Sequence, residues 1–206
     1  MAERDSGQGV TLPQRCIPWP ESISPAAVAM LKAADATPSR SSYPPASDHD
    51  GWRRVIAETD AIMVQYFAGV NEAGIDGETT TIAGVTCHYA KPAGHDPDDQ
   101  RVYLDIHGGG LVFGAGEFAR LGGIRAAQLH KVASVAVDYR MPPDHPYPAA
   151  LDDCLSVYAA LVAQHGAGNL VVGGSSAGGN LAAALMLRAH DAGLPMPAGL
   201  VLMTPE

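Results

Sequence analysis

The octapeptide GGSSAGGN sets two adjacent serines among glycines, a combination that can support nucleophilic chemistry. The spacing Gly174-x-Ser176-x-Gly178 fits the G-x-S-x-G pattern, in which a serine on a sharp strand-to-helix turn attacks a carbonyl carbon. The other register, centred on Ser175, would need a glycine at position 177, which is Ala177. The sequence therefore predicts Ser176 as the nucleophile, with Gly174 and Gly178 making room for the tight turn.

A second glycine cluster, HGGG at residues 107–110, follows an apolar stretch and precedes Ser176. Glycine N–H groups can approach the oxyanion of a tetrahedral intermediate because no side chain stands in the way. The N–H of Ala177, directly after the serine, is a further donor in such sites. Phosphate-binding patterns fit less well, since G-x-G-x-x-G is missing and Asn180 stands where a P-loop needs lysine. The two clusters together predict acyl transfer.

The elements that must position these clusters alternate between strand and helix from about residue 100. We expect strands at 102–106, 132–140, 169–175 and 198–206, with helices at 124–130, 147–166 and 177–193. Apolar strands that alternate with helices predict a mostly parallel sheet covered by helices. Both glycine clusters follow such strands, so we expect them at the carboxyl edge of the sheet.

The part before residue 100 is predicted to contain a loose arm at 1–22, a helix at 24–35, a linker at 38–51, an amphipathic helix at 52–68 and a strand pair at 79–91. We therefore expect two parts, a helical arm or cap over 1–70 and an α/β core over 71–206.

Composition narrows the class of protein. The chain has 206 residues and a formal net charge of −9, with no basic run, which argues against binding to nucleic acid or to an anionic membrane. No apolar run approaches the roughly 18 residues of a membrane span, and the N-terminus does not resemble a signal peptide. The three cysteines are far apart, which favours reduced thiols and a cytoplasmic location. Neither a metal nor an organic cofactor is expected.

Three stretches in order, HGGG, DYRMPPDHPYPAALDD and GGSSAGGN, resemble the hormone-sensitive-lipase group of α/β-hydrolases, which contains carboxylesterases and lipases. The resemblance runs from about residue 80 to the C-terminus, and the helical arm is similar to the cap of that family. It implies an α/β-hydrolase fold and a serine carboxylesterase that forms an acyl-enzyme from short or medium acyl esters or lactones. Two small departures are Ser175, where the family commonly has Asp, and Asp144, where it commonly has Glu.

The resemblance also implies roles for individual residues. Ser176 is then the nucleophile. The oxyanion hole is then formed by backbone N–H groups of Gly109, with Gly108 or Gly110, and of Ala177. The supporting residues are His107, which anchors the glycine loop and is not the base, Gly174, Gly178, Tyr139 and Arg140.

A third departure concerns the base, because the chain order in this fold is serine, acid, histidine. The residues after Ser176 contain one histidine, His190, and one aspartate, Asp191, and both lie about 20 Å away at the far end of the predicted helix. We therefore expect the catalytic acid and base to lie outside this chain and the C-terminal strands of the fold to be missing. A C-terminal segment or a second copy would then cover the exposed edge of the last strand. The alternative is a small-molecule binding protein on a hydrolase scaffold, with Ser176 as a hydrogen-bonding wall residue.

Overall fold

The computed structural model describes residue 16 and residues 18–36 and 43–205. The chain divides into two compact units, Met1–Ser42 and Tyr43–Glu206, which are considered separately. In the first unit, helix α1 (Pro25–Ala36) begins after Ser24, whose Oγ accepts a hydrogen bond from the Ala27 N–H at 3.2 Å. Most of the predicted arm at 1–22, and residues 38–42 of the predicted linker, lie outside the described residues.

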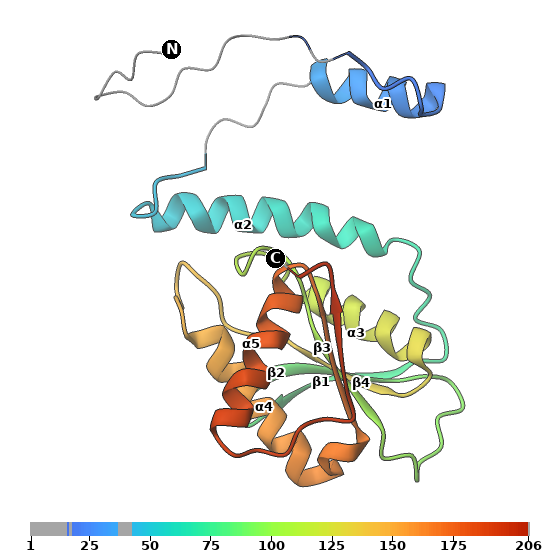
Figure 1. Ribbon diagram of the computed structural model, residues 1–206, viewed down its shortest axis with the longest axis vertical. Coiled ribbons are helices and arrows are strands. Elements are labelled where there is room, and N and C mark those ends of the chain that lie inside the picture. The colour runs from blue at the N-terminus through green and yellow to red at the C-terminus, as the bar shows by residue number, and fades with distance from the viewer. Residues whose placement is uncertain (1–15, 17, 37–42, 206) are drawn as a thin grey trace, which may run out of the picture. The chain divides into compact units, whose positions relative to one another are not determined.

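From Val102 onward the second unit alternates strands and helices along the chain (Figure 1). In order, its elements are α2 (His49–Met63), η1 (Val64–Phe67), β1 (Asp76–Ile82), β2 (Val85–Lys91), β3 (Val102–Ile106), α3 (Glu117–His130), β4 (Ala133–Val137), α4 (Ala149–His165), η2 (Ala167–Asn169), β5 (Leu170–Ser175), α5 (Ala177–Asp191) and β6 (Gly199–Met203). The strands form one sheet in the order β1-β2-β4-β3-β5-β6. Strands β4, β3, β5 and β6 pair in parallel, and β1 and β2 are antiparallel. The predicted mostly parallel sheet flanked by helices is confirmed.

The two faces of the sheet bury different apolar clusters. Leu104, Val135 and Val172 point into the larger cluster, which also takes the inward sides of α4 and α5. The opposite face packs against α3, whose Leu121 and Ile124 belong to a second cluster. The two layers are visible in Figure 1, with α4 and α5 on one side of the strands and α3 on the other. Because apolar residues fill both faces, the strands are held in register and present their carboxyl ends together.

Helix α3 begins at Glu117, seven residues before the predicted start at 124. The predicted start is late because the pair Gly122 and Gly123 lowers the helix propensity of this stretch. A Cβ on Gly123 would lie 2.8 Å from the Cβ of Ala136 on β4. The glycines therefore let the helix axis approach the sheet more closely than a side chain would allow, and this close packing stabilises a helix of low intrinsic propensity.

Helix α2 also begins earlier than predicted, at His49, because the Asp48 side chain accepts the Gly51 N–H at 2.8 Å and caps the helix. It belongs to the same compact unit as the sheet. Its Arg53 forms an ion pair with Asp144, which lies in the loop between β4 and α4. The predicted division into an arm over 1–70 and a core over 71–206 stays a prediction.

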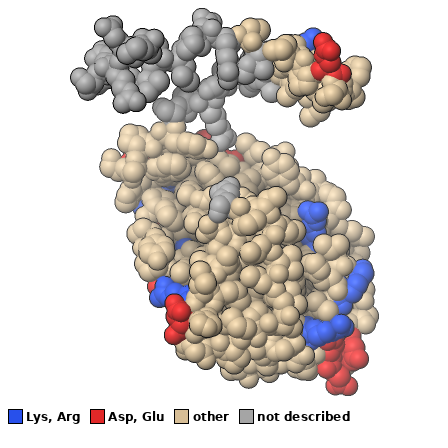
Figure 2. Space-filling view, viewed as in Figure 1, with Lys and Arg blue, Asp and Glu red and all other residues tan. Residues whose placement is uncertain are grey.

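Strand β6 is at one edge of the sheet and is exposed along most of its length. Leu200, Val201, Leu202 and Met203 are 41%, 36%, 40% and 48% exposed. On the face shown in Figure 2, charged side chains of the second unit lie toward its rim and the middle is largely uncharged. This edge therefore offers apolar side chains together with strand positions that pair with no other described strand. Among the described residues, no helix is both long enough and apolar enough to cross a membrane.

Candidate active site

Ser176 occupies a sharp bend between β5 and α5. Its φ of 54° and ψ of −129° lie in a region that residues with a side chain rarely adopt. The Ser176 N–H donates to the carbonyl of Met203 on β6 at 2.9 Å, and its own carbonyl accepts from the N–H of Gly179 at 2.8 Å. The neighbouring strand and the first turn of α5 thus hold the strained backbone in place, at the positive end of the helix dipole.

The glycines on either side of the serine have no room for a side chain. A Cβ on Gly174 would lie 2.2 Å from the carbonyl oxygen of Gly178, and a Cβ on Gly178 would lie 2.1 Å from the carbonyl oxygen of Ile106. The bend brings β5, α5 and β3 into backbone contact, so the glycines of the G-x-S-x-G pattern are required sterically. Position 173 excludes a side chain for a different reason, because a Cβ on Gly173 would lie 1.8 Å from the hydroxyl of Tyr103.

The glycine loop lies directly beside this bend. Strands β3 and β5 are parallel neighbours with Ile106 opposite Gly174, so the segments that follow them emerge at the same edge. A Cβ on Gly108 would lie 2.7 Å from the carbonyl oxygen of Ser175 and 3.4 Å from the Cβ of Ser176. Gly109 and Gly110 have φ values of +123° and +63°, which favour glycine. The structure therefore brings the predicted nucleophile and the predicted oxyanion loop together.

His107 is packed into the base of the glycine loop. Its ring stacks on Tyr139 with centroids 4.1 Å apart, and Nδ1 lies 2.8 Å from the carbonyl oxygen of Gly108. The Tyr139 hydroxyl donates to the His107 carbonyl at 2.7 Å. Burial lowers the pKa of His107 to about 4, so the ring is neutral at pH 7. These contacts fit an anchoring role for His107 and give it no approach to the Ser176 hydroxyl through Nδ1.

Arg140, predicted as a supporting residue, forms a two-pronged ion pair with Asp153 of α4. The Arg140 Nη2 lies 2.7 Å from Oδ1 of Asp153 and Nε lies 3.0 Å from Oδ2. The backbone N–H of Arg140 also donates to Oδ2 at 2.9 Å. Asp153 has no motif of its own, but it is a carboxylate within an apolar helix face, a pattern that indicates a paired charge.

Asp138 was also missed. It follows β4 directly, and its Oδ1 accepts the Gly116 N–H at 3.0 Å while its Oδ2 lies 3.5 Å from His88 Nε2. Burial opposes ionisation of Asp138, but the His88 ring and the Gly116 N–H outweigh it and lower the pKa of the carboxyl. A polar residue at the carboxyl end of a buried parallel strand is the signal that could have identified it.

Three histidines, His130, His165 and His190, lie away from Ser176. His130 and His165 end α3 and α4, on the side where the parallel strands begin. His190 lies near the end of α5, fourteen positions after Ser176, which at 1.5 Å per residue is about 20 Å. The structure therefore does not bring His190 or Asp191 to the nucleophile.

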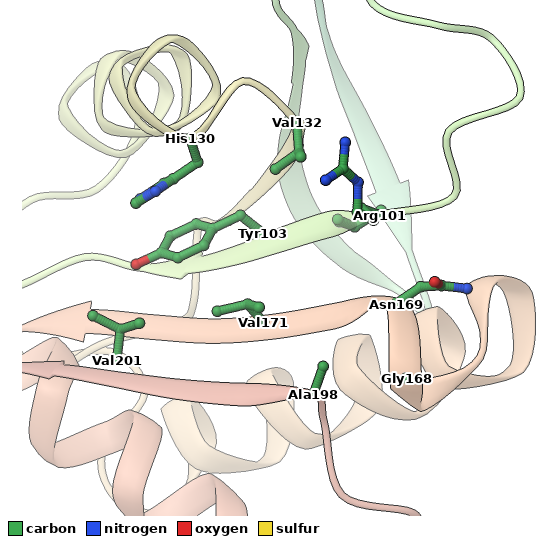
Figure 3. Close-up of a pocket in the computed structure, with 10 residues that line it drawn as sticks. Arg101, Tyr103, His130, Val132, Gly168, Asn169, Val171, Ala198 and Val201 are labelled. Carbon is green, nitrogen blue, oxygen red and sulfur yellow. The ribbon is translucent and has the colours of Figure 1, made fainter.

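A hollow of about 260 Å³ lies on the sheet face beside α3, near the start of the parallel strands. In Figure 3 the rings of Tyr103 and His130 face each other above β3, and Val171 and Val201 extend from the neighbouring strands. The two ring centroids are 4.3 Å apart. The hollow is thus separate from Ser176, which follows the opposite end of β5.

Comparison with known proteins agrees with this geometry. The model of a family described as having the alpha/beta hydrolase fold matches residues 103–206. An acetyl-hydrolase of Streptomyces hygroscopicus is 33% identical over 130 residues, which cover 63% of this chain and 42% of that protein. The esterase LipI of Mycobacterium tuberculosis is 34% identical over 176 residues, which cover 81% and 52% of the two chains.

Solved structures give the same result. The crystal structure of a hormone-sensitive lipase from a metagenome library aligns with a TM-score of 0.70 and 30% identity, over 89% of this chain and 58% of that one. The chain belongs to the alpha/beta hydrolase family, and the predicted resemblance to the hormone-sensitive-lipase group is confirmed. The chain spans about half the length of the curated relatives that it matches.

Proposed function

We propose that this chain carries the nucleophile and oxyanion hole of a cytoplasmic serine carboxylic-ester hydrolase that acts on short or medium acyl esters or lactones. The observation that carries the proposal is the close packing of Gly108 against Ser175 and Ser176, which leaves only backbone between the glycine loop and the nucleophile. Relatives named as an acetyl-hydrolase and an esterase support the reaction class.

In the proposed reaction, Ser176 Oγ attacks the ester carbonyl and the resulting oxyanion is stabilised by backbone N–H groups. Gly109, with Gly108 or Gly110, and Ala177 supply these donors. Collapse of the tetrahedral intermediate expels the alcohol and leaves an acyl group on Ser176, which water then removes. A histidine takes the serine proton and passes it to the leaving alcohol.

That histidine and its carboxylate partner are supplied from outside residues 1–206. Two observations support this part of the proposal. His107 is neutral and packed against Tyr139, and His190 is about 20 Å along α5 from Ser176. The curated relatives are about twice as long as the stretch they share with this chain.

The exposed edge of β6 is the proposed attachment surface for the segment or second copy that brings the acid and base. Its apolar side chains and unpaired backbone positions favour pairing with another strand. Met203 of this strand accepts the Ser176 N–H, so a strand added to the free side of β6 would lie two strand spacings, about 10 Å, from β5.

The test is hydrolysis of p-nitrophenyl acetate and butyrate by the 206-residue chain alone and by the product that includes any codons after Glu206. We expect turnover only in the longer product or with an added partner chain, with an initial burst of p-nitrophenol from the acyl-enzyme. Ser176→Ala should lower kcat by about 10⁴-fold or more, whereas the matched variant Ser175→Ala should retain activity within about fivefold.

Equal activity of Ser176→Ala and the unchanged protein would overturn the assignment of the nucleophile. Ligand binding without turnover in every form would favour the binding-protein alternative, in which Ser176 only contributes a hydrogen bond.

A further inference from the structure

We infer that Asp60 of helix α2 is a positioning residue that holds the glycine loop in the geometry needed for the oxyanion hole. This inference rests on the proposed function of the loop. Asp60 lies 54 positions before Gly114, and its Oδ1 accepts the Gly114 N–H at 2.7 Å. It belongs to the stretch 1–70 that the sequence predicts to form a helical arm or cap.

Gly114 is where the loop after β3 closes back on its own beginning. Its φ is +97°, and a Cβ there would lie 2.9 Å from both the Gly108 carbonyl oxygen and the His107 Nδ1. Gly114 therefore lies close to Gly108, the residue that packs on Ser176, and a side chain at position 114 would collide with it. The hydrogen bond to Asp60 fixes the backbone at this point of closure.

Asp138 holds the same loop from the other side. Its Oδ1 accepts the Gly116 N–H at 3.0 Å, so two carboxylates bind two N–H groups that are only two residues apart. One carboxylate comes from α2 and the other from the end of β4. Burial raises the pKa of Asp60, the Gly114 N–H lowers it, and the nearby charge of Asp138 raises it further. Two like charges are thus kept together at the loop, where each accepts a backbone hydrogen bond.

Besides the hydrogen bond of Asp60, other contacts attach α2 and the turn that follows it to the rest of the second unit. At one end Arg53 pairs with Asp144, and beyond the other end Phe67 packs edge-on against Phe118 with centroids 4.9 Å apart. These contacts attach α2 to the loop before α4 and to α3. Asp60 is thus one of several residues through which α2 contacts the rest of the second unit, and its hydrogen bond is made to the glycine loop itself.

The experiment compares Asp60→Ala, Asp60→Asn and Arg53→Ala, with the exposed Glu58→Ala on the same helix as the matched control. Amide hydrogen exchange of the 206-residue chain, followed by NMR, reports the Gly114 N–H whether or not the chain turns over. We expect exchange at Gly114 to accelerate about tenfold or more in Asp60→Ala. Asp60→Asn, which keeps the acceptor oxygen, should restore the protection, and Arg53→Ala and Glu58→Ala should leave it unchanged.

In the form that hydrolyses p-nitrophenyl butyrate, Asp60→Ala should lower kcat about 10- to 100-fold with KM changed less than threefold, and Asp60→Asn should recover most of kcat. Unchanged exchange at Gly114 in Asp60→Ala, or the same loss of kcat in Arg53→Ala, would overturn the inference. If no form hydrolyses esters, the proposed function fails, and faster Gly114 exchange in Asp60→Ala still supports the hold on the loop.

Discussion

Asp105 offers a test of the fold that does not depend on catalysis. It lies on β3 two residues before His107, and its Oδ2 is 3.3 Å from the point where a Cβ of Gly122 would lie. The carboxyl therefore lies between the sheet and α3, and Asp105 is partly buried. Burial raises the pKa of Asp105 from an ordinary value of 3.8 to about 7. We expect Asp105→Asn, which is uncharged at every pH, to be more stable than the unchanged protein in neutral and alkaline solution.

The sign and size follow from proton linkage. Below pH 3.8 the carboxyl is protonated in both the folded and unfolded chains, so it adds no charge penalty. Between pH 3.8 and 7 only the unfolded chain ionises readily, and the folded state loses stability as the pH rises. A separation of about 3 units at 1.36 kcal/mol per unit sets an upper limit of about 4 kcal/mol for the advantage of Asp105→Asn above pH 7.

The measurement is urea unfolding of both proteins from pH 4 to pH 8.5. The difference in unfolding free energy should grow by up to about 1.4 kcal/mol per pH unit and level off above pH 7. The exposed carboxylate variant Asp98→Asn is the control and should give a constant difference. A constant difference for Asp105→Asn as well would refute the reasoning, because it would mean that the carboxyl of Asp105 has no raised pKa.

Two further predictions concern the site. Gly174→Ala should destabilise the chain by more than about 2 kcal/mol or prevent folding, because the added methyl group meets the Gly178 carbonyl oxygen at 2.2 Å. The control Gly168→Ala, which has open space around it, should change thermal stability by less than about 1 kcal/mol. Equal melting temperatures of the two variants would contradict the steric argument. The His107 ring should remain neutral in NMR titration down to about pH 5, because burial lowers its pKa to about 4. The free energy of unfolding should therefore fall as the pH drops from 6.5 toward 4. A titration midpoint near 6.5 would show that the ring is solvated.

The sequence predicted the alternating strands and helices after residue 100 because apolar runs and glycine turns are local signals. It missed the first half of α3, where Gly122 and Gly123 lower helix propensity. Only contact with the sheet explains these glycines, since Gly123 lies against Ala136. The start of α2 was placed late for a related reason. The stretch around Asp48 has turn-like composition, and the capping hydrogen bond to Gly51 becomes evident only in three dimensions.

In the candidate site, too, residues with a local sequence motif were predicted and residues defined by tertiary contacts were not. Ser176 and the glycine loop were identified because each has a short motif, and the parallel pairing of β3 with β5 brings them together. The carboxylates that hold the loop have no such motif. Asp60 and Gly114 are 54 positions apart, and nothing in the local sequence indicates that one accepts a hydrogen bond from the other. Contacts of this kind depend on how α2 packs, which periodicity alone does not specify.

The contact between Gly173 and Tyr103 has a consequence for sequence change along this lineage. A methyl group at 173 would coincide with the phenol oxygen at 1.8 Å, so the two positions share one volume although they are 70 residues apart. Either position can grow only if the other shrinks. Gly173, which directly precedes the G-x-S-x-G motif, therefore reflects the size of a neighbour on β3, and a chain with a small residue at 103 could carry alanine at 173 without disturbing the turn that presents the serine.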